Sequence, residues 1–172
     1  MTYTIGLESG HTAHPELDPL YRQHYAEMQD RLASQGIPIG PYAPRLDEYF
    51  KGMDAGYILT FVVRFDGAPV GYANIYLTSD MHNSQPISSE DTIFVTKAHR
   101  NGIGRRLTKF IIEELRSRGV LRAWATATTD PRVVLMLERM GWRRAATVMV
   151  YNFEDPKNAP KKDASSDPGT SA

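Results

Sequence analysis

The sequence contains no cysteine. This absence excludes a disulfide framework, a cysteine-ligated zinc site and a thiolate nucleophile. The sequence also lacks any apolar run near the length of about 18 residues that a membrane-spanning helix requires. Residues 1–10 lack the basic and apolar regions of a secretory signal. We therefore expect a cytoplasmic protein with no membrane partner.

The chain carries no net charge, because 20 Lys and Arg residues balance 20 Asp and Glu residues. This balance excludes the uniformly basic surface of a DNA-coating protein and the acidic composition of a solvating tail. The charge is nevertheless uneven, since residues 97–144 contain 12 basic and 4 acidic side chains. A basic half within a neutral protein favours a phosphate-rich ligand.

With 172 residues, of which 41% are hydrophobic, the chain has the size and apolar content of one folded domain. Residues 154–172 have no large apolar side chain. Such a segment cannot contribute to a core. We therefore expect one domain at 1–153 and a disordered C-terminal tail at 154–172.

The apolar patterning predicts groups of helices and strands. Strands are expected at 2–7, 57–65, 69–77, 91–96, 120–128 and 146–153. Helices are expected at 18–35, around 46–53, from 103 to Gly119, and from Pro131 to Gly141. Asp18 is the expected cap of the first helix, and Asp66-Gly67 is typical of a hairpin turn. A polar loop is expected at 78–89.

A glycine-bearing turn between the strand at 91–96 and the following helix carries the clearest chemical signal. It contains Gly102 and Gly104, and Arg105 follows them. Glycines let a ligand approach the backbone, and the free amides at a helix N-terminus attract anions. The turn therefore predicts a phosphate or diphosphate site. It lacks the patterns of a dinucleotide-binding fold and of a P-loop.

The run from Val95 to Leu107 resembles the signature Arg/Gln-x-x-Gly-x-Gly/Ala of the GNAT superfamily of acyl-CoA-dependent N-acyltransferases. His99 stands at the first signature position, and Arg100 follows one residue later. The run Leu137-Glu138-Arg139-Met140-Gly141-Trp142 is also similar to that family, as is the Asp66-Gly67 hairpin with Val70-Gly71. The resemblance extends over about 57–153.

This resemblance implies an α+β fold with a mixed, mostly antiparallel central sheet flanked by helices. It also implies an N-acetyltransferase that uses acetyl-CoA as co-substrate and acylates an amine of a small molecule or protein. In the resembled family, main chain of the fourth strand pairs with pantetheine and the turn binds the diphosphate. The implied cofactor-binding residues are Phe94, Val95, Arg100, Asn101, Gly102, Ile103, Gly104 and Arg105.

An amine must lose a proton before it attacks a thioester, so a carboxylate near the reacting atoms is needed. Glu90 and Asp91 open the relevant strand and are the candidate general bases. Regular alternation places Asp91 on the same face as Ile93 and Val95. No general acid is assigned, because Leu137 stands where many members of the resembled family have a proton-donating Tyr. We expect no metal site.

Two alternatives come from a second resemblance. The segment 20–28, with Met81-His82 and Asp91, is similar to GNAT-like proteins of tailed bacteriophages, one branch of which modifies adenine in phage DNA. The first alternative is therefore an enzyme that modifies a nucleobase in DNA. The second is a non-catalytic virion or regulatory protein. This alternative is favoured by Leu137, which stands where many members of the resembled family have a proton-donating Tyr. The patterns fix neither the acyl acceptor nor the oligomeric state.

Overall fold

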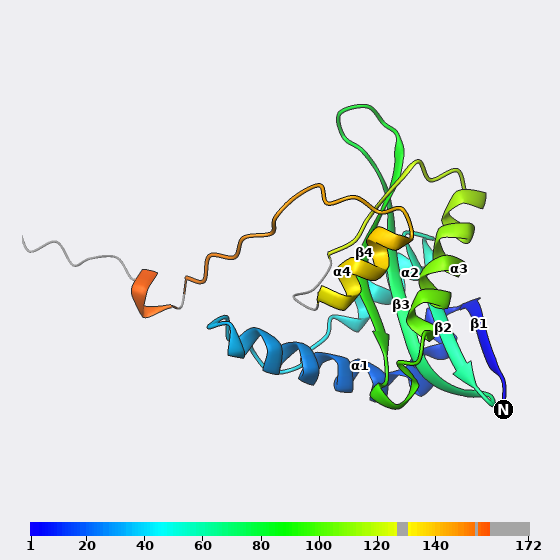
Figure 1. The fold of residues 1–172 in the computed structure, drawn as a ribbon, viewed down its shortest axis with the longest axis horizontal. Coiled ribbons are helices and arrows are strands. Elements are labelled where there is room, and N and C mark those ends of the chain that lie inside the picture. Colours follow the sequence, from blue (N-terminus) through cyan, green and yellow to red (C-terminus); the bar gives the residue numbers. More distant parts are fainter. Residues whose placement is uncertain (127–130, 154, 159–172) are drawn as a thin grey trace, which may run out of the picture.

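The computed structural model describes residues 1–126, 131–153 and 155–158. Positions 127–128 of the strand expected at 120–128 and most of the expected tail lie outside the described residues. The elements, in order along the chain (Figure 1), are β1 (Tyr3–Glu8), α1 (Gly10–Ser34), α2 (Leu46–Asp54), β2 (Ile58–Phe65), β3 (Ala68–Ser79), β4 (Pro86–Val95), a 3-10 turn (Lys97–His99), α3 (Ile103–Ser117), β5 (Arg122–Trp124), α4 (Pro131–Arg139) and a second 3-10 turn (Pro156–Asn158).

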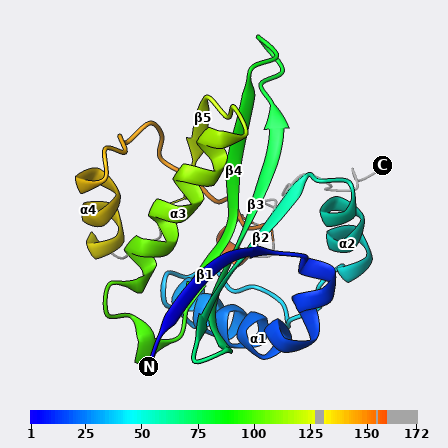
Figure 2. The ribbon, with the colours of Figure 1, turned by 90° about the vertical axis from the view of Figure 1, so that its right-hand side faces the viewer.

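The five strands form one sheet in the order β1-β2-β3-β4-β5. The first three pairs are antiparallel, and β4 pairs with β5 in parallel. Helices lie on both sides of this sheet, with α3 and α4 on one side and α1 on the other (Figure 2). The expected α+β fold with a mixed, mostly antiparallel sheet is confirmed. Among the described residues, no helix is long and apolar enough to cross a membrane.

The larger core lies between the sheet and α3. Leu107 of α3 is fully buried against sheet residues that include Phe61, Val63 and Ala73. The buried apolar residues of α3 recur every four positions, which places them on one face of the helix. They are Ile103, Leu107, Ile111 and Leu115. This packing holds the start of α3 next to the end of β4.

A smaller core lies on the opposite face, where Leu17 of α1 is buried against Val62, Tyr72 and Phe94. The helix begins at Gly10, not at the expected Asp18, and Ser9 caps it by accepting a hydrogen bond from the amide of Thr12. The expectation was wrong because the helix contains prolines, which remove backbone hydrogen bonds. Burial of Ala13 and Leu17 in the first turns offsets that loss.

The strands β3 and β4 are longer than the sequence predicts, so the loop expected at 78–89 shrinks to residues 80–85. Its polar composition was misleading, because Ser88 is buried where β4 lies between two neighbouring strands. The strand β5 is only three residues long. These two differences leave a long β4 that extends well beyond its short parallel neighbour.

The strand expected at 146–153 is absent, since these described residues have no regular structure. Their apolar side chains are 59–87% exposed, and the segment runs away from the sheet (orange in Figure 1). The β-branched composition alone predicted a strand. A strand also needs a neighbour with which to pair, and the sheet ends at the short β5.

Candidate functional site

A β-bulge in β4 sets the geometry of the site. Thr92 pairs with Asn74 of β3 and Glu90 pairs with Ile75, so Asp91 is an extra residue without a partner across the strands. A bulge breaks the alternation of side chains and often lies next to an active site. Asp91 therefore lines the same cavity as Thr92, on the α1 side of the sheet. The expectation that Asp91 shares a face with Ile93 is wrong for this reason.

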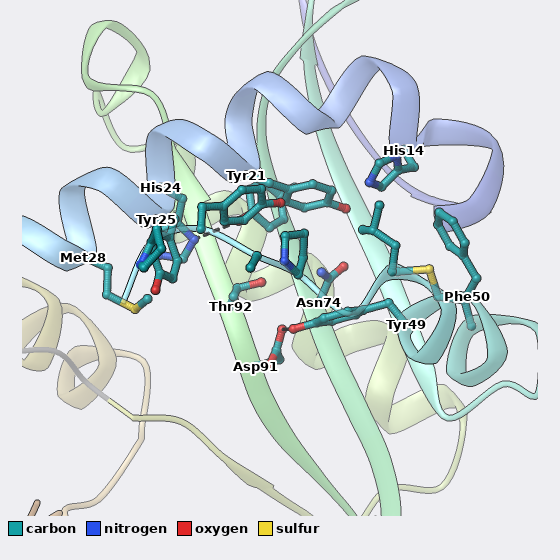
Figure 3. A pocket seen from close by; sticks show the side chains of 17 residues that line it. His14, Tyr21, His24, Tyr25, Met28, Tyr49, Phe50, Asn74, Asp91 and Thr92 are labelled. Carbon is teal, nitrogen blue, oxygen red and sulfur yellow. Dashed lines mark hydrogen bonds between the residues drawn. The ribbon is translucent and has the colours of Figure 1, made fainter. Parts of the chain in front are cut away.

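The cavity lies between α1, α2, the segment 41–44 and the sheet (Figure 3). Its volume is about 360 Å³. Its lining is mostly aromatic and apolar, and Asp91 is the single acidic residue in it within the part of the chain that the structure describes. The residues that line the cavity are His14, Tyr21, His24, Tyr25, Met28, Pro41, Tyr42, Ala43, Pro44, Leu46, Tyr49, Phe50, Met53, Tyr72, Asn74, Asp91 and Thr92.

Asp91 has the position and environment of a proton acceptor. The hydroxyl of Tyr49 donates a hydrogen bond of 2.9 Å to its Oδ2, and Figure 3 shows the two side chains directed at one another. Burial raises the pKa of Asp91, while hydrogen bonds from Tyr49 and Tyr76 act in the opposite direction. A half-buried carboxylate that faces a cavity can accept a proton from a bound amine.

Glu90, the other candidate base, lies on the opposite face of the sheet. It pairs with Ile75, which belongs to the α3-side core, and it does not line the cavity. Burial, with a smaller contribution from the charge of Asp91, raises the pKa of Glu90 to about 7. The structure thus separates two carboxylates that are adjacent in the sequence.

His24 also lines the cavity. Its Nδ1 is 2.8 Å from the Tyr72 hydroxyl, and its ring stacks on Phe94 at a centroid distance of 5.0 Å. Burial lowers the pKa of His24 to about 4, so the ring is neutral near pH 7. His24 therefore adds packing and no positive charge to the cavity.

The edge of β4 beyond β5 is open. β5 pairs only with Ile87, Ser88 and Ser89, so among the described residues no strand covers β4 from Glu90 to Val95 on this side. The amide of Thr96 donates to Val70 of β3, and the carbonyl of Val95 therefore points toward the open edge. The side chains of Phe94 and Val95 are buried in the two cores. The main chain of Val95 thus faces the open edge, where an extended ligand can pair with it, whereas the carbonyl of Phe94 is directed at β3.

The glycine turn follows directly at the end of this edge. Gly102 has a φ of 98° and precedes the first residue of α3, a conformation that favours glycine. Across the described chain, the amides of Ile103, Gly104 and Arg105 have no acceptor. A Cβ added to Gly104 would have no neighbour within 4 Å. An anion can therefore approach these amides closely.

The two residues before Gly102 are engaged within the protein. The Arg100 side chain donates to the Val95 carbonyl at 2.7 Å and to the Glu27 carboxylate at 2.7 Å. The amide of Asn101 donates to the carbonyl of His99 at 2.9 Å. Arg100 thus lies across the open edge of β4, whereas Asn101 contributes to the turn.

Sequence reasoning missed a basic groove of about 480 Å³ beside α3. Its lining combines Arg105, Lys109, Ile112 and Arg116, which recur at intervals of four, three and four residues, with Arg106, Glu113 and Met140. Residues at such intervals share one face of a helix. This periodicity was the signal that could have identified the groove. Its position next to the free amides extends the positive potential of the turn.

Comparison with known proteins is consistent with this geometry. The model of the acetyltransferase (GNAT) family matches residues 20–142. No curated protein matches the sequence. Among solved structures, an aminoglycoside acetyltransferase from an uncultured soil metagenomic sample is 19% identical, with a TM-score of 0.68 over 88% of this chain and 99% of that chain.

Two further structures share the fold. A ribosomal-protein-alanine N-acetyltransferase from Brucella melitensis biovar Abortus is 20% identical, with a TM-score of 0.62 over 87% of this chain and 99% of that chain. An aminoglycoside acetyltransferase in complex with a bisubstrate analogue that joins CoA to acetylneamine is 16% identical, with a TM-score of 0.65 over 88% and 98% of the two chains. The match of the family model over most of the chain shows that this protein belongs to the acetyltransferase (GNAT) family.

Proposed function

We propose that the protein is an N-acetyltransferase that transfers the acetyl group of acetyl-CoA to the amine of an acceptor bound in the aromatic cavity. One observation carries the proposal. The bulge directs Asp91 into the cavity at the point where the open edge of β4 begins, and that edge leads directly to the free amides of α3. A proton acceptor, an open main-chain edge and an anion site therefore follow one another along β4 and the start of α3.

The chain's own groups fit acetyl-CoA. The amides of Ile103, Gly104 and Arg105 suit a diphosphate, since they have no acceptor among the described residues and the space over Gly104 is open. Of the expected pair Phe94 and Val95, the main chain of Val95 lies at the open edge and suits a pantetheine amide, which would take the place of the Arg100 side chain on the Val95 carbonyl. Gly102, Arg100 and Asn101 form the turn between these two parts. The basic groove offers further cations for phosphate groups.

Bound acetyl-CoA supplies the acetyl group as a thioester. The acceptor enters as an ammonium ion, and Asp91 takes its proton directly or through water. The neutral nitrogen then forms a bond to the thioester carbonyl carbon, and the carbon–sulfur bond breaks. The sulfur leaves with the bonding electron pair, the attacking nitrogen loses its second proton, and the sulfur takes up one proton, so the products are the N-acetylated amine and free CoA. Asp91 returns its proton to solvent.

Calorimetric titration with acetyl-CoA tests the cofactor half of the proposal. We expect the wild-type protein to bind and a Gly104→Trp variant to lose binding, because the indole would fill the space over the amides. Gly104→Ala is the matched control, since its methyl group meets no atom within 4 Å. Binding that is equal in the wild type and Gly104→Trp would show that the anion site is misplaced.

A nucleobase in DNA is a second candidate acceptor, and the basic groove is the observation that favours it. Retention on DNA that falls steeply with salt, with loss on Arg105→Gln and Lys109→Gln substitution, would support this candidate. Absence of retention at low salt would exclude it. The non-catalytic alternative predicts no acetyl-CoA binding and is tested by the same titration.

A further inference from the structure

The geometry points to a specific class of acceptor: a small primary monoamine with a flat, apolar body. This inference rests on the proposed N-acetyltransferase function and concerns the same cavity. It follows from two properties of the lining, namely its charge and its walls.

The charge of the cavity fits a single ammonium group. Asp91 is the only acidic side chain that lines it, and no Lys or Arg side chain does so among the described residues. His24 is neutral near pH 7. A second or third ammonium group of a polyamine or aminoglycoside would be buried here without a counter-charge, which is costly. The cavity therefore selects against polycations.

The walls fit a flat apolar body. The rings of Tyr21 and Tyr72 meet edge to face, with centroids 4.4 Å apart, and His14 meets Phe50 in the same way at 5.2 Å. Aromatic walls pack well against a ring or short aliphatic chain and attract a nearby cation. A cavity of about 360 Å³ accommodates a small molecule and leaves little room for several linked sugar rings.

The walls are also fixed in position before any ligand binds. The hydroxyl of Tyr25 donates to the carbonyl of Gly40 at 2.6 Å, and the Gln29 amide donates to the carbonyls of Ile39 and Gly40. These bonds fasten the segment that leads into the cavity wall at 41–44 to α1. A preformed wall reduces the ordering cost of binding a small ligand.

The test uses four amines, with two readouts for each. Tyramine and 2-phenylethylamine have the predicted features, whereas spermidine and neamine are polycations. Calorimetry without acetyl-CoA measures amine binding, and release of the CoA thiol measures turnover. We expect kcat/KM for each of the two monoamines to exceed that for spermidine and neamine by at least about tenfold.

The possible failures are distinguishable. Higher kcat/KM for a polycation, or for a peptide with a free N-terminus, would overturn the monoamine class. Acetyl-CoA binding without binding of either monoamine would overturn it as well, while the proposed acetyl-CoA site would be retained. Tyramine binding without any acetyl-CoA binding would support the cavity's selectivity and reject the proposed acetyl transfer.

Discussion

Tyr49 of α2 donates a hydrogen bond of 2.9 Å to Asp91 at the bulge of β4. This contact joins two elements that are 42 residues apart in sequence and fixes the carboxylate inside the cavity. It also ties the protonation of Asp91 to the position of α2.

Asp91→Asn keeps the shape of the side chain and removes its ability to accept a proton. We expect kcat to fall by about 10²–10⁴-fold, the usual contribution of a general base, with acetyl-CoA affinity unchanged. Steady-state kinetics and calorimetry measure the two quantities. Asp47→Asn, at an exposed position of α2, is the control and should retain activity. Full activity of Asp91→Asn would remove Asp91 from the reaction.

The pH profile of kcat/KM reports the ionisation of Asp91. Burial raises the pKa of this carboxyl above that of an ordinary Asp. The acid limb of the profile, in which activity falls as Asp91 becomes protonated, should therefore lie at a higher pH than for an ordinary Asp. Tyr49→Phe removes a hydrogen bond that lowers this pKa and should move the acid limb to still higher pH. A Glu90→Gln background isolates the effect from the neighbouring carboxyl. A limb that moves to lower pH would contradict the assignment.

Glu90→Gln should stabilise the fold at alkaline pH. The pKa of Glu90 is about 7 in the folded protein against an ordinary 4.5, so only the folded state retains the proton between these values. Wild-type stability therefore falls as the pH rises from about 4.5 to 7. Because Gln does not ionise, we expect a gain of about 1–3 kcal/mol at pH 8, since a tenfold change in acidity corresponds to about 1.4 kcal/mol.

Urea unfolding at pH 8 and at pH 4 measures this effect. The difference between Glu90→Gln and wild type should be near zero at pH 4, where the side chain is protonated in both states. Glu113→Gln, at an exposed position of α3, is the control. A Glu90→Gln variant that is less stable at pH 8 would show that the charged form is favoured in the fold.

Gly71→Ala should destabilise the strand pair that carries the open edge. A Cβ at Gly71 would lie 2.8 Å from the carbonyl oxygen of Phe94 and 3.0 Å from a methyl group of Val95. Relief of this contact requires a backbone shift, and we expect a loss of about 1–3 kcal/mol in the free energy of unfolding. Gly40→Ala, whose Cβ meets nothing within 4 Å, should change stability much less. Thermal unfolding compares the two variants.

The sequence predicted those elements whose structure is set by residues close together in the chain. Asp66 and Gly67 both have positive φ, 48° and 87°, as the hairpin turn between β2 and β3 requires. The helix α3 and the turn at Gly102 were likewise predicted from apolar periodicity and glycine placement. In each case the residues that set the structure are neighbours in the chain.

Features that depend on pairing between distant segments could not be predicted in this way. The bulge at Asp91 is a property of the β3–β4 register, and regular alternation placed the carboxylate on the wrong face. The expected strand at 146–153 has β-forming residues and no described partner strand. Tyr49 appears in the sequence only as an apolar position of a short helix. Its role depends on the folded position of α2.

The bulge has a consequence for how this protein can change. Asp91 pairs with no residue across the strands, so the ladder of β3 and β4 does not depend on a cross-strand partner of its side chain. Under the proposed mechanism, one substitution at this position would separate an acetyltransferase from a protein that binds the same ligands without turnover.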